Sequence, residues 1–329
     1  MTALAGSTCL VTGGYGFIGA NLVHRLVDSG ARVRVIDALV ATHGGDRRNL
    51  LGTGDVEVLE ARLGDPRARD LVAGCDLIFN VAGQVSHTAS MSDPVTDLEL
   101  NALDHARFLE IVRAVNPGVR IVHTSTRQVY GRAERLPADE TVAAHPVDVN
   151  GVAKWAGEKL HMVYSQALGI RSTSLRISNT YGPRQRLTSD ELGVLPVFVR
   201  KALRGETIEI FGDGSQRRDC LHVDDVVDAL LVATDDRAVG RFYNVGHHTD
   251  HSLAEIAMTI VDAAREAGGS GSDVRLVPWP DAHARVDIGS FATDSSRIAD
   301  ELGWKAQIAL ADGVRTTFEF YREHPGYLA

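Results

Sequence analysis

The residues that first suggest chemistry are three glycines near the start of the chain. Gly13, Gly16 and Gly19 have the spacing G-x-x-G-x-x-G and directly follow an apolar run at residues 8–12. Glycine permits a tight turn and lets the backbone approach a pyrophosphate, whose charge then meets the free N–H groups at the start of a helix. Because a strand pattern precedes the glycines and a helical pattern follows them, they predict a dinucleotide-binding turn rather than an ordinary glycine-rich loop.

A carboxylate, Asp37, ends the next β-rich run. At this distance from the glycines, a carboxylate accepts hydrogen bonds from both ribose hydroxyls and repels a 2′-phosphate, which favours NAD over NADP. Arg47 and Arg48 could receive a phosphate, but they stand beyond the end of the strand. Asp37 could instead cap a turn. The sequence predicts NAD as the cofactor.

A parallel sheet is needed to hold these residues, and the N-terminal part has the matching pattern. Short β-rich runs at residues 8–12, 32–36, 56–59, 77–81 and 119–124 alternate with segments of helical spacing, including 21–29 and 94–115. Strands that alternate with helices form right-handed βαβ crossovers and a parallel sheet. We therefore predict an α/β fold with a doubly wound parallel sheet of the Rossmann type.

The second half of the chain has a less regular pattern. It indicates helices at 151–166, 194–203, 224–234, 252–267 and 311–321, a strand at 173–177, a polar loop at 182–192 and a flexible link at 268–272. We predict a cofactor domain over residues 1–175 and a smaller α/β substrate lobe over 176–329. Segments are expected to interleave between the two, with the substrate lying between them.

Composition excludes several other classes of protein. With 329 residues, 44% of them hydrophobic, the chain can bury a substantial core. The 34 Lys and Arg against 43 Asp and Glu argue against a nucleic-acid partner. No apolar stretch approaches the ~18 residues of a membrane span, and the N-terminus lacks the regions of a signal peptide. Cys9, Cys75 and Cys220 form neither a metal-binding spacing nor a disulfide framework, so we expect reduced thiols, no metal and a cytoplasmic protein.

Further motifs resemble the extended short-chain dehydrogenase/reductase family, the group of nucleotide-sugar epimerases, dehydratases and decarboxylases. The resemblance runs almost end to end. Besides the glycine turn, it rests on Gly64-Asp65, Thr124-Ser125-Thr126 with Val129-Tyr130-Gly131, Lys154 with Gly157-Glu158-Lys159, Arg176 with Asn179-Thr180-Tyr181-Gly182-Pro183, Gly212-Asp213-Gly214 with Arg218-Asp219, and Leu302-Gly303-Trp304.

The resemblance implies an NAD site and a nucleotide-diphosphate sugar as substrate. Asp65 would meet the adenine, and the segment 81–83 would pass along the cofactor. The implied cofactor-binding residues are Gly13, Tyr15, Gly16, Phe17, Ile18, Gly19, Asp37, Leu63, Asp65, Val81, Ala82, Gly83, Thr124 and Lys154.

The resemblance also implies three catalytic positions, and this chain departs from the family at one of them. A Ser or Thr, a Tyr and a Lys carry the chemistry, and the motifs place the first and last at Thr126 and Lys154. Position 150, where the tyrosine of Y-x-x-x-K belongs, is Asn150, although the surrounding frame is intact. The family's tyrosine takes a sugar hydroxyl proton as hydride leaves for NAD. An amide cannot do so, although Asn150 could still orient the hydroxyl.

Three interpretations of Asn150 remain open. The base could have moved to His87, whose side chain is suited to proton transfer near neutral pH, or to a water held by Thr126 and Asn150. The substrate could need weaker assistance from a base, or the protein could bind without catalysing hydride transfer. His87 could equally be a surface loop histidine. His123 is interpreted as a satisfied strand residue without a function.

The residues that follow Thr126 bear on the type of reaction. By resemblance, 4,6-dehydratases carry Asp-Glu where this chain has Arg127-Gln128, and decarboxylases keep a glutamate in place of Gln128. The 4-epimerases have the fewest requirements for particular residues in this segment, so we predict an NAD-dependent nucleotide-sugar 4-epimerase. A dehydratase or decarboxylase with relocated acid and base, and a catalytically silent binding protein, are the alternatives. Arg127 could instead pair with a substrate carboxylate.

The remaining predictions concern substrate and partner. By resemblance, Arg218 and Asn179 bind the diphosphate, for which the guanidinium fork is suited. Arg285 is a further candidate. Other predicted substrate contacts are Gln84, Ser86, Thr126, Arg127 and Gln128. Relatives dimerise through two helices as a four-helix bundle, so we expect a homodimer through residues 94–115 and 151–166.

Overall fold

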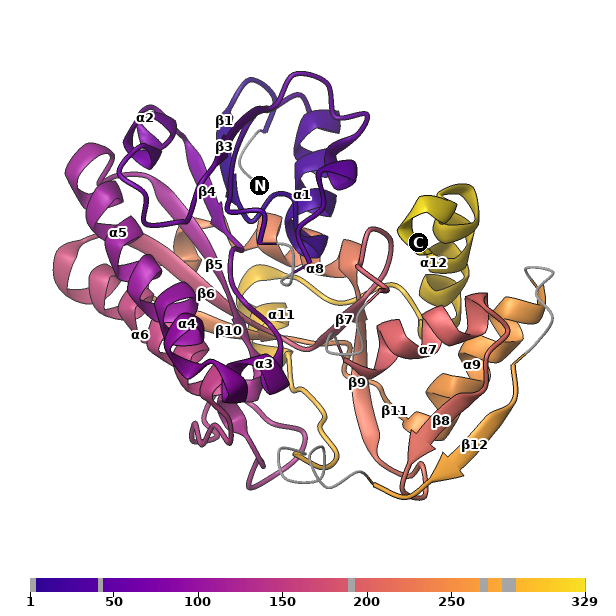
Figure 1. The fold of residues 1–329 in the computed structure, drawn as a ribbon. Coiled ribbons are helices and arrows are strands. Elements are labelled where there is room, and N and C mark those ends of the chain that lie inside the picture. The colour runs from indigo at the N-terminus through magenta and orange to yellow at the C-terminus, as the bar shows by residue number, and fades with distance from the viewer. Residues whose placement is uncertain (1–3, 41–43, 189–192, 267–271, 280–287, 329) are drawn as a thin grey trace.

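The centre of the molecule is a seven-stranded parallel sheet (Figure 1). The computed structural model describes residues 4–40, 44–188, 193–266, 272–279 and 288–328. In pairing order, the strands are β10 (Phe242–Val245), β6 (Arg171–Ile177), β5 (Arg120–Thr126), β4 (Leu77–Asn80), β1 (Thr8–Thr12), β2 (Arg32–Asp37) and β3 (Glu57–Glu60). Every neighbouring pair is parallel, which confirms the predicted doubly wound α/β fold.

Helices cover both faces of this sheet (Figure 1). One face is covered by α1 (Phe17–Asp28), α8 (Val223–Val232) and α11 (Ser296–Leu302). The other is covered by α2 (Ala68–Val72), α5 (Asp104–Val115) and α6 (Val149–Leu168). Burial from both sides explains why the inner strands β1 and β4 read as short, uncharged runs. Among the helices that the structure describes, none has the length and apolar character needed to cross a bilayer.

The predicted helical segment 94–115 is helical throughout but not uniform. It contains α4 (Pro94–Leu98), a π-helical turn η3 (Glu99–Leu103) and α5, and α3 (His87–Ser92) precedes it. Asp93 caps α4 by accepting the N–H of Thr96 at 3.1 Å, and Pro94 occupies the first turn, where its missing N–H costs nothing. The π-turn brings Asn101 to the inside of the molecule, where it is 1% exposed.

A smaller unit with its own core lies beside the sheet (Figure 1). Its helices are α7 (Val194–Leu203), α9 (Leu253–Glu266) and α12 (Leu310–Glu323), which pack with the parallel pair β8 (Ile208–Phe211) and β12 (Val274–Val277). A second small sheet joins β7 (Asn179–Tyr181), β9 (Arg217–His222) and β11 (Asp250–Ser252). Short 3₁₀ turns η2 (Arg47–Leu50), η4 (Arg127–Tyr130), η5 (Asp236–Ala238) and η6 (Pro325–Leu328) complete the described elements.

Elements from the second half of the chain return to the central sheet. The edge strand β10 pairs in parallel with β6, and α8 and α11 belong to the first core. The sequence pattern did not reveal β10, nor the strands of the smaller sheets. Residues 189–192 of the predicted loop 182–192 lie outside the described residues, as do residues 268–271 of the predicted link.

A buried ion pair joins α6 to the sheet. The guanidinium of Arg176 on β6 donates to both oxygens of Glu158 on α6, at 2.9 and 2.6 Å, and the two side chains are 3% and 0% exposed. Arg176 also donates to the hydroxyl of Tyr130, at 2.8 Å, and that hydroxyl donates to Asn244 on β10, at 2.7 Å. The network ties a helix, two strands and the end of β5 together at one point.

Removing the charge of Glu158 should destabilise the fold strongly. Glu158→Gln keeps the shape of the side chain but leaves the buried guanidinium of Arg176 without a counter-charge, so we expect a loss of about 3 kcal/mol. Asp262→Asn on α9 is the matched control, since its pair with Arg265 is largely exposed, and it should cost less than about 0.5 kcal/mol. Urea unfolding followed by circular dichroism measures both. Equal losses in the two variants would contradict this account of the ion pair.

Candidate active site

The predicted glycine turn lies between β1 and α1. Gly13 has a φ of +72°, in the left-handed region that favours glycine. A Cβ on Gly19 would lie 2.1 Å from the carbonyl oxygen of Gly13, so a side chain at that position would disrupt the turn. Gly16 is the N-cap of α1, and no described side chain caps the helix. The first N–H groups of α1 are therefore available to an anion.

A cleft opens over this turn. Its lining includes the predicted cofactor residues Gly13, Gly16, Phe17, Ile18, Gly19, Asp37, Leu63, Val81, Ala82 and Gly83, and the predicted substrate residue Gln84. Four other predicted cofactor residues within the described part of the chain do not line the cleft: Tyr15, Asp65, Thr124 and Lys154. A cleft at the carboxyl ends of parallel strands is where dinucleotides bind in this architecture.

Asp37 is held at the cleft by two backbone groups. One carboxylate oxygen accepts the N–H of Tyr15 at 2.9 Å, and the other accepts the N–H of Leu39 at 2.8 Å. Burial raises the pKa of Asp37, and these two hydrogen bonds oppose that shift. Each carboxylate oxygen keeps further acceptor capacity, so both can still accept bonds from ribose hydroxyls.

Asp65, predicted to meet the adenine, pairs with a neighbouring arginine. The carboxylate of Asp65 accepts two hydrogen bonds from the guanidinium of Arg67, at 3.0 and 2.8 Å, and this pairing lowers the pKa of Asp65 to about 2. Arg62, which was not predicted, lines the cleft and donates to Asp104 at 2.7 Å. The role of Asp65 toward adenine remains a prediction.

Lys154 reaches the wall of the cleft from α6. A Cβ on Gly83 would lie 2.3 Å from Nζ of Lys154 and 2.6 Å from Oδ1 of Asn101, so a side chain at this position would force these groups to move. Burial lowers the pKa of Lys154 to about 8, and the charge of Asp97 opposes the shift. Asp97 is itself 1% exposed and accepts a hydrogen bond from Asn101 at 3.1 Å. The lysine therefore sits beside the cofactor cleft with a carboxylate nearby.

Asn150 is buried in the same network and faces the protein framework. Its amide nitrogen has three acceptors at 3.1 Å, namely the backbone oxygen and Oε1 of Gln84 and Oδ2 of Asp97. Its backbone N–H donates to Ser90 at 3.2 Å. Since the amide has only two hydrogens, these acceptors already occupy its donor capacity. Asn150 links α6 to α4 and to the loop after β4.

His87 lies in a chain of polar contacts that includes Thr126. Its Nδ1 is 2.8 Å from a carboxylate oxygen of Asp148, and its Nε2 is 2.9 Å from the amide nitrogen of Gln128. Because a carboxylate accepts and an amide nitrogen donates, Nδ1 carries the proton and Nε2 presents a lone pair. The backbone N–H of Gln128 in turn donates to Oγ1 of Thr126 at 3.2 Å. The structure thus brings His87, Gln128 and Thr126 together.

Asp148 holds His87 and also begins the helix that carries Asn150 and Lys154. Its second oxygen accepts the N–H of Gly151 at 2.7 Å, as the N-cap of α6. Burial alone would raise the pKa of Asp148, but the hydrogen bonds from His87 and Gly151 bring it below the usual value. An ionised carboxylate here stabilises a protonated imidazole at position 87.

Several predicted substrate residues contact neighbouring parts of the protein. Arg127 donates to Oδ1 of Asn179 at 2.8 Å, and its guanidinium lies 5.1 Å from the ring centre of Phe291. Arg218 donates to the carbonyl oxygen of Gly289 at 2.6 Å. Ser86 caps α3 by accepting the N–H of Ala89 at 3.1 Å. Arg285 lies outside the described residues.

Two buried acceptors in this region have no partner among the described residues, Oε1 of Gln128 and Oγ of Ser125. A buried polar atom is normally satisfied, so such atoms indicate a missing donor. Hydroxyl groups of a sugar would supply donors of this kind. Gln128 follows Thr126 by two residues, whereas Ser125 precedes it on β5 and points to the opposite face of the sheet, so only Oε1 of Gln128 is a candidate for contact with a ligand near Thr126.

Besides Arg62, sequence reasoning missed Asp97, Asn101 and Asp148. Asp97 and Asn101 are four residues apart and joined by a hydrogen bond of 3.1 Å across the π-turn. That spacing on a helical segment was a signal that they share a face. Asp148 precedes an amphipathic run as a capping residue would, which was also visible in the sequence. Nothing in the sequence linked it to His87.

Comparisons with known proteins agree with this geometry. Residues 9–246 match the profile of the NAD dependent epimerase/dehydratase family. The chain is 34% identical over 318 residues to UDP-glucose 4-epimerase of Mycolicibacterium smegmatis, which covers 95% of this chain and 98% of the relative. It is 31% identical over 326 residues to dTDP-glucose 4,6-dehydratase of Streptomyces niveus, covering 96% and 93%.

A solved structure is similar over the same length. It is UDP-glucose 4-epimerase of Thermotoga maritima with UDP-glucose, at a TM-score of 0.86 and 29% identity, covering 97% of this chain and 99% of that one. The resemblance inferred from the motifs is therefore confirmed, and the family description names the predicted cofactor, NAD.

Replacing Asp37 by Asn should weaken NAD binding and reduce discrimination against NADP. The amide loses one accepting oxygen and the charge that repels a 2′-phosphate. We expect the Kd for NAD to rise about ten- to a hundredfold, the range for losing a hydrogen bond to a charged group. Isothermal titration calorimetry measures both cofactors. Asp70→Asn, which changes an exposed carboxylate on α2, is the control, and an unchanged Kd in Asp37→Asn would exclude the ribose contact.

Proposed function

The chain belongs to the NAD dependent epimerase/dehydratase family, and we propose that it is a nucleotide-sugar 4-epimerase in which His87 replaces the absent tyrosine as base. Membership of the family supports NAD and a nucleoside diphosphate sugar. The finer proposal rests on one observation, the chain of contacts from Thr126 through Gln128 and His87 to Asp148.

The proposed reaction assigns one task to each of these side chains. NAD, when bound, supplies the acceptor and then the donor of the hydride. Nε2 of His87 takes the proton of the C4 hydroxyl in the place that the Gln128 amide occupies in the free protein. The carboxylate of Asp148 stabilises the imidazolium through Nδ1, as in other oriented histidine bases. Thr126 orients the hydroxyl. After the keto sugar has turned, His87 returns the proton.

The contacts of Asn150 support a base elsewhere. An amide does not titrate near neutral pH, and the hydrogens of this amide already point at Gln84 and Asp97. Nζ of Lys154 lies beside Gly83, which lines the cleft. A positive charge there would favour hydride transfer from the sugar to NAD. The site therefore retains the lysine and has lost only the proton acceptor of the family's mechanism.

Epimerisation is preferred to dehydration because of the residues in η4. Expelling water from a sugar needs a base for one carbon-bound proton and an acid for the leaving hydroxyl, in addition to the redox step. Arg127, which donates to Asn179, and Gln128, which donates to His87, supply neither. Arg127 and Arg218 instead suit the recognition of diphosphate or carboxylate groups.

A panel of nucleotide sugars tests the proposal. UDP- and dTDP-linked hexoses and hexuronic acids, incubated with the protein and NAD, should yield a product of unchanged mass that separates from its substrate by chromatography. A product lighter by one water would overturn the proposal in favour of a dehydratase. NAD binding without turnover of any sugar would favour a silent binding protein.

Within the same assay, His87→Gln should lower kcat by about a hundred- to ten-thousandfold, the usual contribution of a general base. Asp148→Asn should lower kcat less, because asparagine still caps α6. NAD affinity should stay unchanged in both variants. His145→Gln, at an exposed neighbouring histidine, is the control. A kcat for His87→Gln equal to that of His145→Gln would remove His87 from the mechanism.

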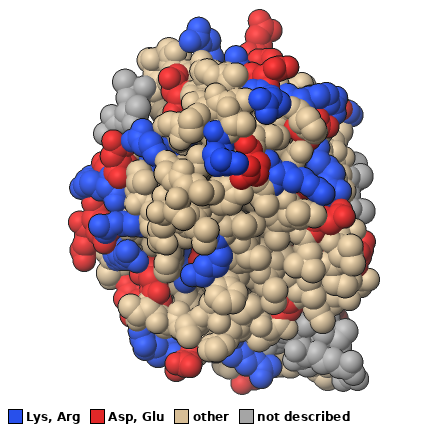
Figure 2. Space-filling model, turned by 90° about the vertical axis from the view of Figure 1, so that its left-hand side faces the viewer, with Lys and Arg blue, Asp and Glu red and all other residues tan. Residues whose placement is uncertain are grey.

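We also propose that the protein is a homodimer through α4, η3, α5 and α6. Exposed apolar side chains gather there, at Val95 (66% exposed), Leu98 (41%), Leu103 (45%), Val152 (45%) and Val163 (53%). Figure 2 looks onto the side of the molecule that these helices form and shows a broad area without charged side chains. Several exposed apolar side chains on one uncharged side of a molecule are typical of an interface.

Val163→Asp should convert the dimer to a monomer, since a buried carboxylate without a partner is costly at an interface. Light scattering after size exclusion should give twice the chain mass of 35.4 kDa for the wild type. Met258→Asp, on α9 and 46% exposed, should leave the dimer intact. A monomeric wild type would refute the proposed interface.

A further inference from the structure

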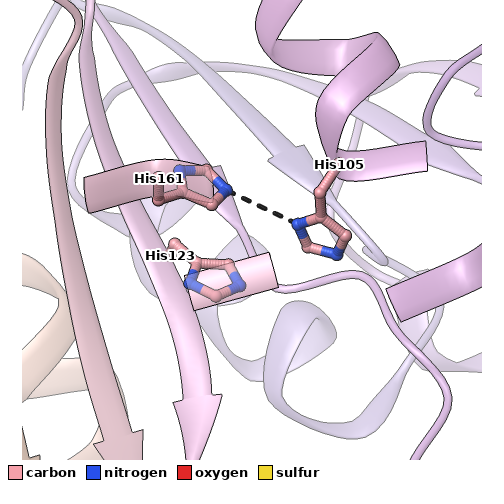
Figure 3. Close-up of side chains that lie close together, drawn as sticks. All are labelled: His105, His123 and His161. Carbon is pink, nitrogen blue, oxygen red and sulfur yellow. Dashed lines mark hydrogen bonds between the residues drawn. The ribbon is translucent and has the colours of Figure 1, made fainter. Parts of the chain in front are cut away.

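Three histidines, His105, His123 and His161, lie close together in the interior of the molecule (Figure 3). His105 comes from α5, His123 from β5 and His161 from α6. They are 1%, 1% and 0% exposed. One ring nitrogen of each lies within 4.8 Å of the others.

Burial disfavours the charged form of all three imidazoles. Burial lowers the pKa of His105 and His123 well below the usual value, and that of His161 to about 3. A neutral imidazole has one N–H and one nitrogen with a free lone pair, and only the second can bind a metal. The cluster therefore offers three uncharged nitrogen ligands.

The lone pairs of two of them converge. The amide nitrogen of Asn80 on β4 lies 3.2 Å from Nδ1 of His105 and 3.1 Å from Nε2 of His161. Because the amide donates, both ring nitrogens face it as acceptors. These two ring nitrogens lie 3.5 Å apart. A cation bound to both would stabilise two lone pairs that lie so close together.

The outer nitrogens of two rings are held by serines. Nδ1 of His161 is 2.8 Å from Oγ of Ser172, and Nδ1 of His123 is 3.1 Å from Oγ of Ser174. Both serines lie on β6 and are 0% exposed. Histidines that ligate metals usually have their second nitrogen bonded in this way, which fixes the tautomer and the ring.

The distances suit a tetrahedral centre. With zinc–nitrogen bonds of about 2.0–2.1 Å, two ligands of one zinc ion lie about 3.3–3.4 Å apart. The distances among three nitrogens, Nδ1 of His105, Nε2 of His161 and Nδ2 of Asn80, are similar. They are 3.5 Å between the two rings, and 3.2 and 3.1 Å from the amide nitrogen to His105 and His161. The amide oxygen and nitrogen are nearly isosteric, so a rotated Asn80 would present its oxygen to the metal. Its nitrogen would then meet Oγ1 of Thr12, now 2.8 Å from the oxygen.

We propose that His105, His123 and His161, with Asn80, form a structural binding site for a zinc-like transition-metal ion. Imidazole ligands without thiolates or nearby carboxylates suit zinc and its neighbours better than magnesium or calcium. His123 is stacked on His161 with ring centres 4.2 Å apart and an angle of 13° between the ring planes. Because an imidazole lone pair lies in the plane of its ring, His123 must turn out of this stack to complete the site. The metal would clamp β4, β5, α5 and α6 together.

The charge of Lys154 opposes binding. Its field lowers the pKa of both His105 and His123, and the same field disfavours any cation in the cluster. Lys154 lies within the field of Asp97, whose carboxylate offsets part of this repulsion. The affinity should therefore be lower than that of a site with a carboxylate ligand.

Metal binding by the full-length protein, with any affinity tag removed, tests this site. After dialysis against Zn²⁺ and then against metal-free buffer, elemental analysis should find about one zinc per chain. Titration of the chelator-treated protein with Co²⁺ should give the visible ligand-field bands of a tetrahedral site. Zn²⁺ should also raise the thermal midpoint, because ligands that bind only the folded state stabilise it.

Variants identify the ligands. His105→Gln and His161→Gln should each abolish the cobalt bands and the thermal shift. His324→Gln, at an exposed histidine that directly follows α12, should retain both. NAD binding and circular dichroism verify that the variants fold. If the histidine variants do not fold, the cobalt spectrum of the wild-type protein tests the proposed site. Absence of zinc and of cobalt bands in the wild type, or metal binding by a folded His161→Gln equal to that of His324→Gln, would overturn the proposal.

Discussion

The position of α6 depends on the buried pair between Glu158 and Arg176. Two charges without access to water are stable only when their remaining hydrogen-bonding groups are also satisfied. Here the guanidinium completes its bonds on the hydroxyl of Tyr130, which in turn donates to Asn244 on the edge strand β10. The pair therefore constrains more than a helix. It couples α6, β6, the turn after β5 and the last strand of the sheet, so none of these can shift without breaking a buried hydrogen bond.

This constraint determines what a substitution at position 150 can do. Asn150, Lys154 and Glu158 follow one another at intervals of four and share a face of α6. With Glu158 fixed, the side chain at position 150 meets Gln84 and Asp97. A shorter side chain than tyrosine cannot be compensated by moving the helix. In the mechanism proposed for this site, the base instead comes from a neighbouring segment, as His87 at the start of α3. The partner of His87, Asp148, caps the same helix, so the orientation of the imidazole is tied to the start of α6.

The sequence predicted the fold and the glycine turn between β1 and α1 because both follow from local patterns. Glycine spacing, a carboxylate at the end of β2 and short apolar strands each have a physical meaning within a few residues. Features that depend on distant partners were not predictable. The strand β10 is four residues long and gains its place only by pairing with β6. Arg62 lines the cleft and Asp65 does not. Which of the two does so depends on the two-residue turn between them, and the sequence pattern did not predict that turn. The contact between His87 and Asp148 joins segments 61 residues apart.

The histidine cluster shows why no spacing rule could find it. His105, His123 and His161 belong to three elements that meet only after the sheet and two of its helices have packed, and His123 alone reads as an ordinary strand residue. His161 also lies on the buried face of α6, beyond Glu158, so this face carries an amide, an ammonium, a carboxylate and an imidazole in succession. A helix face of this kind gains little from the hydrophobic effect. Each polar group must instead find its own partner, on α4, at the cofactor cleft, on β6 or around Asn80. Helix α6, which carries Asn150 and Lys154, is thus held by specific polar contacts along its length, and these contacts fix its position relative to the sheet.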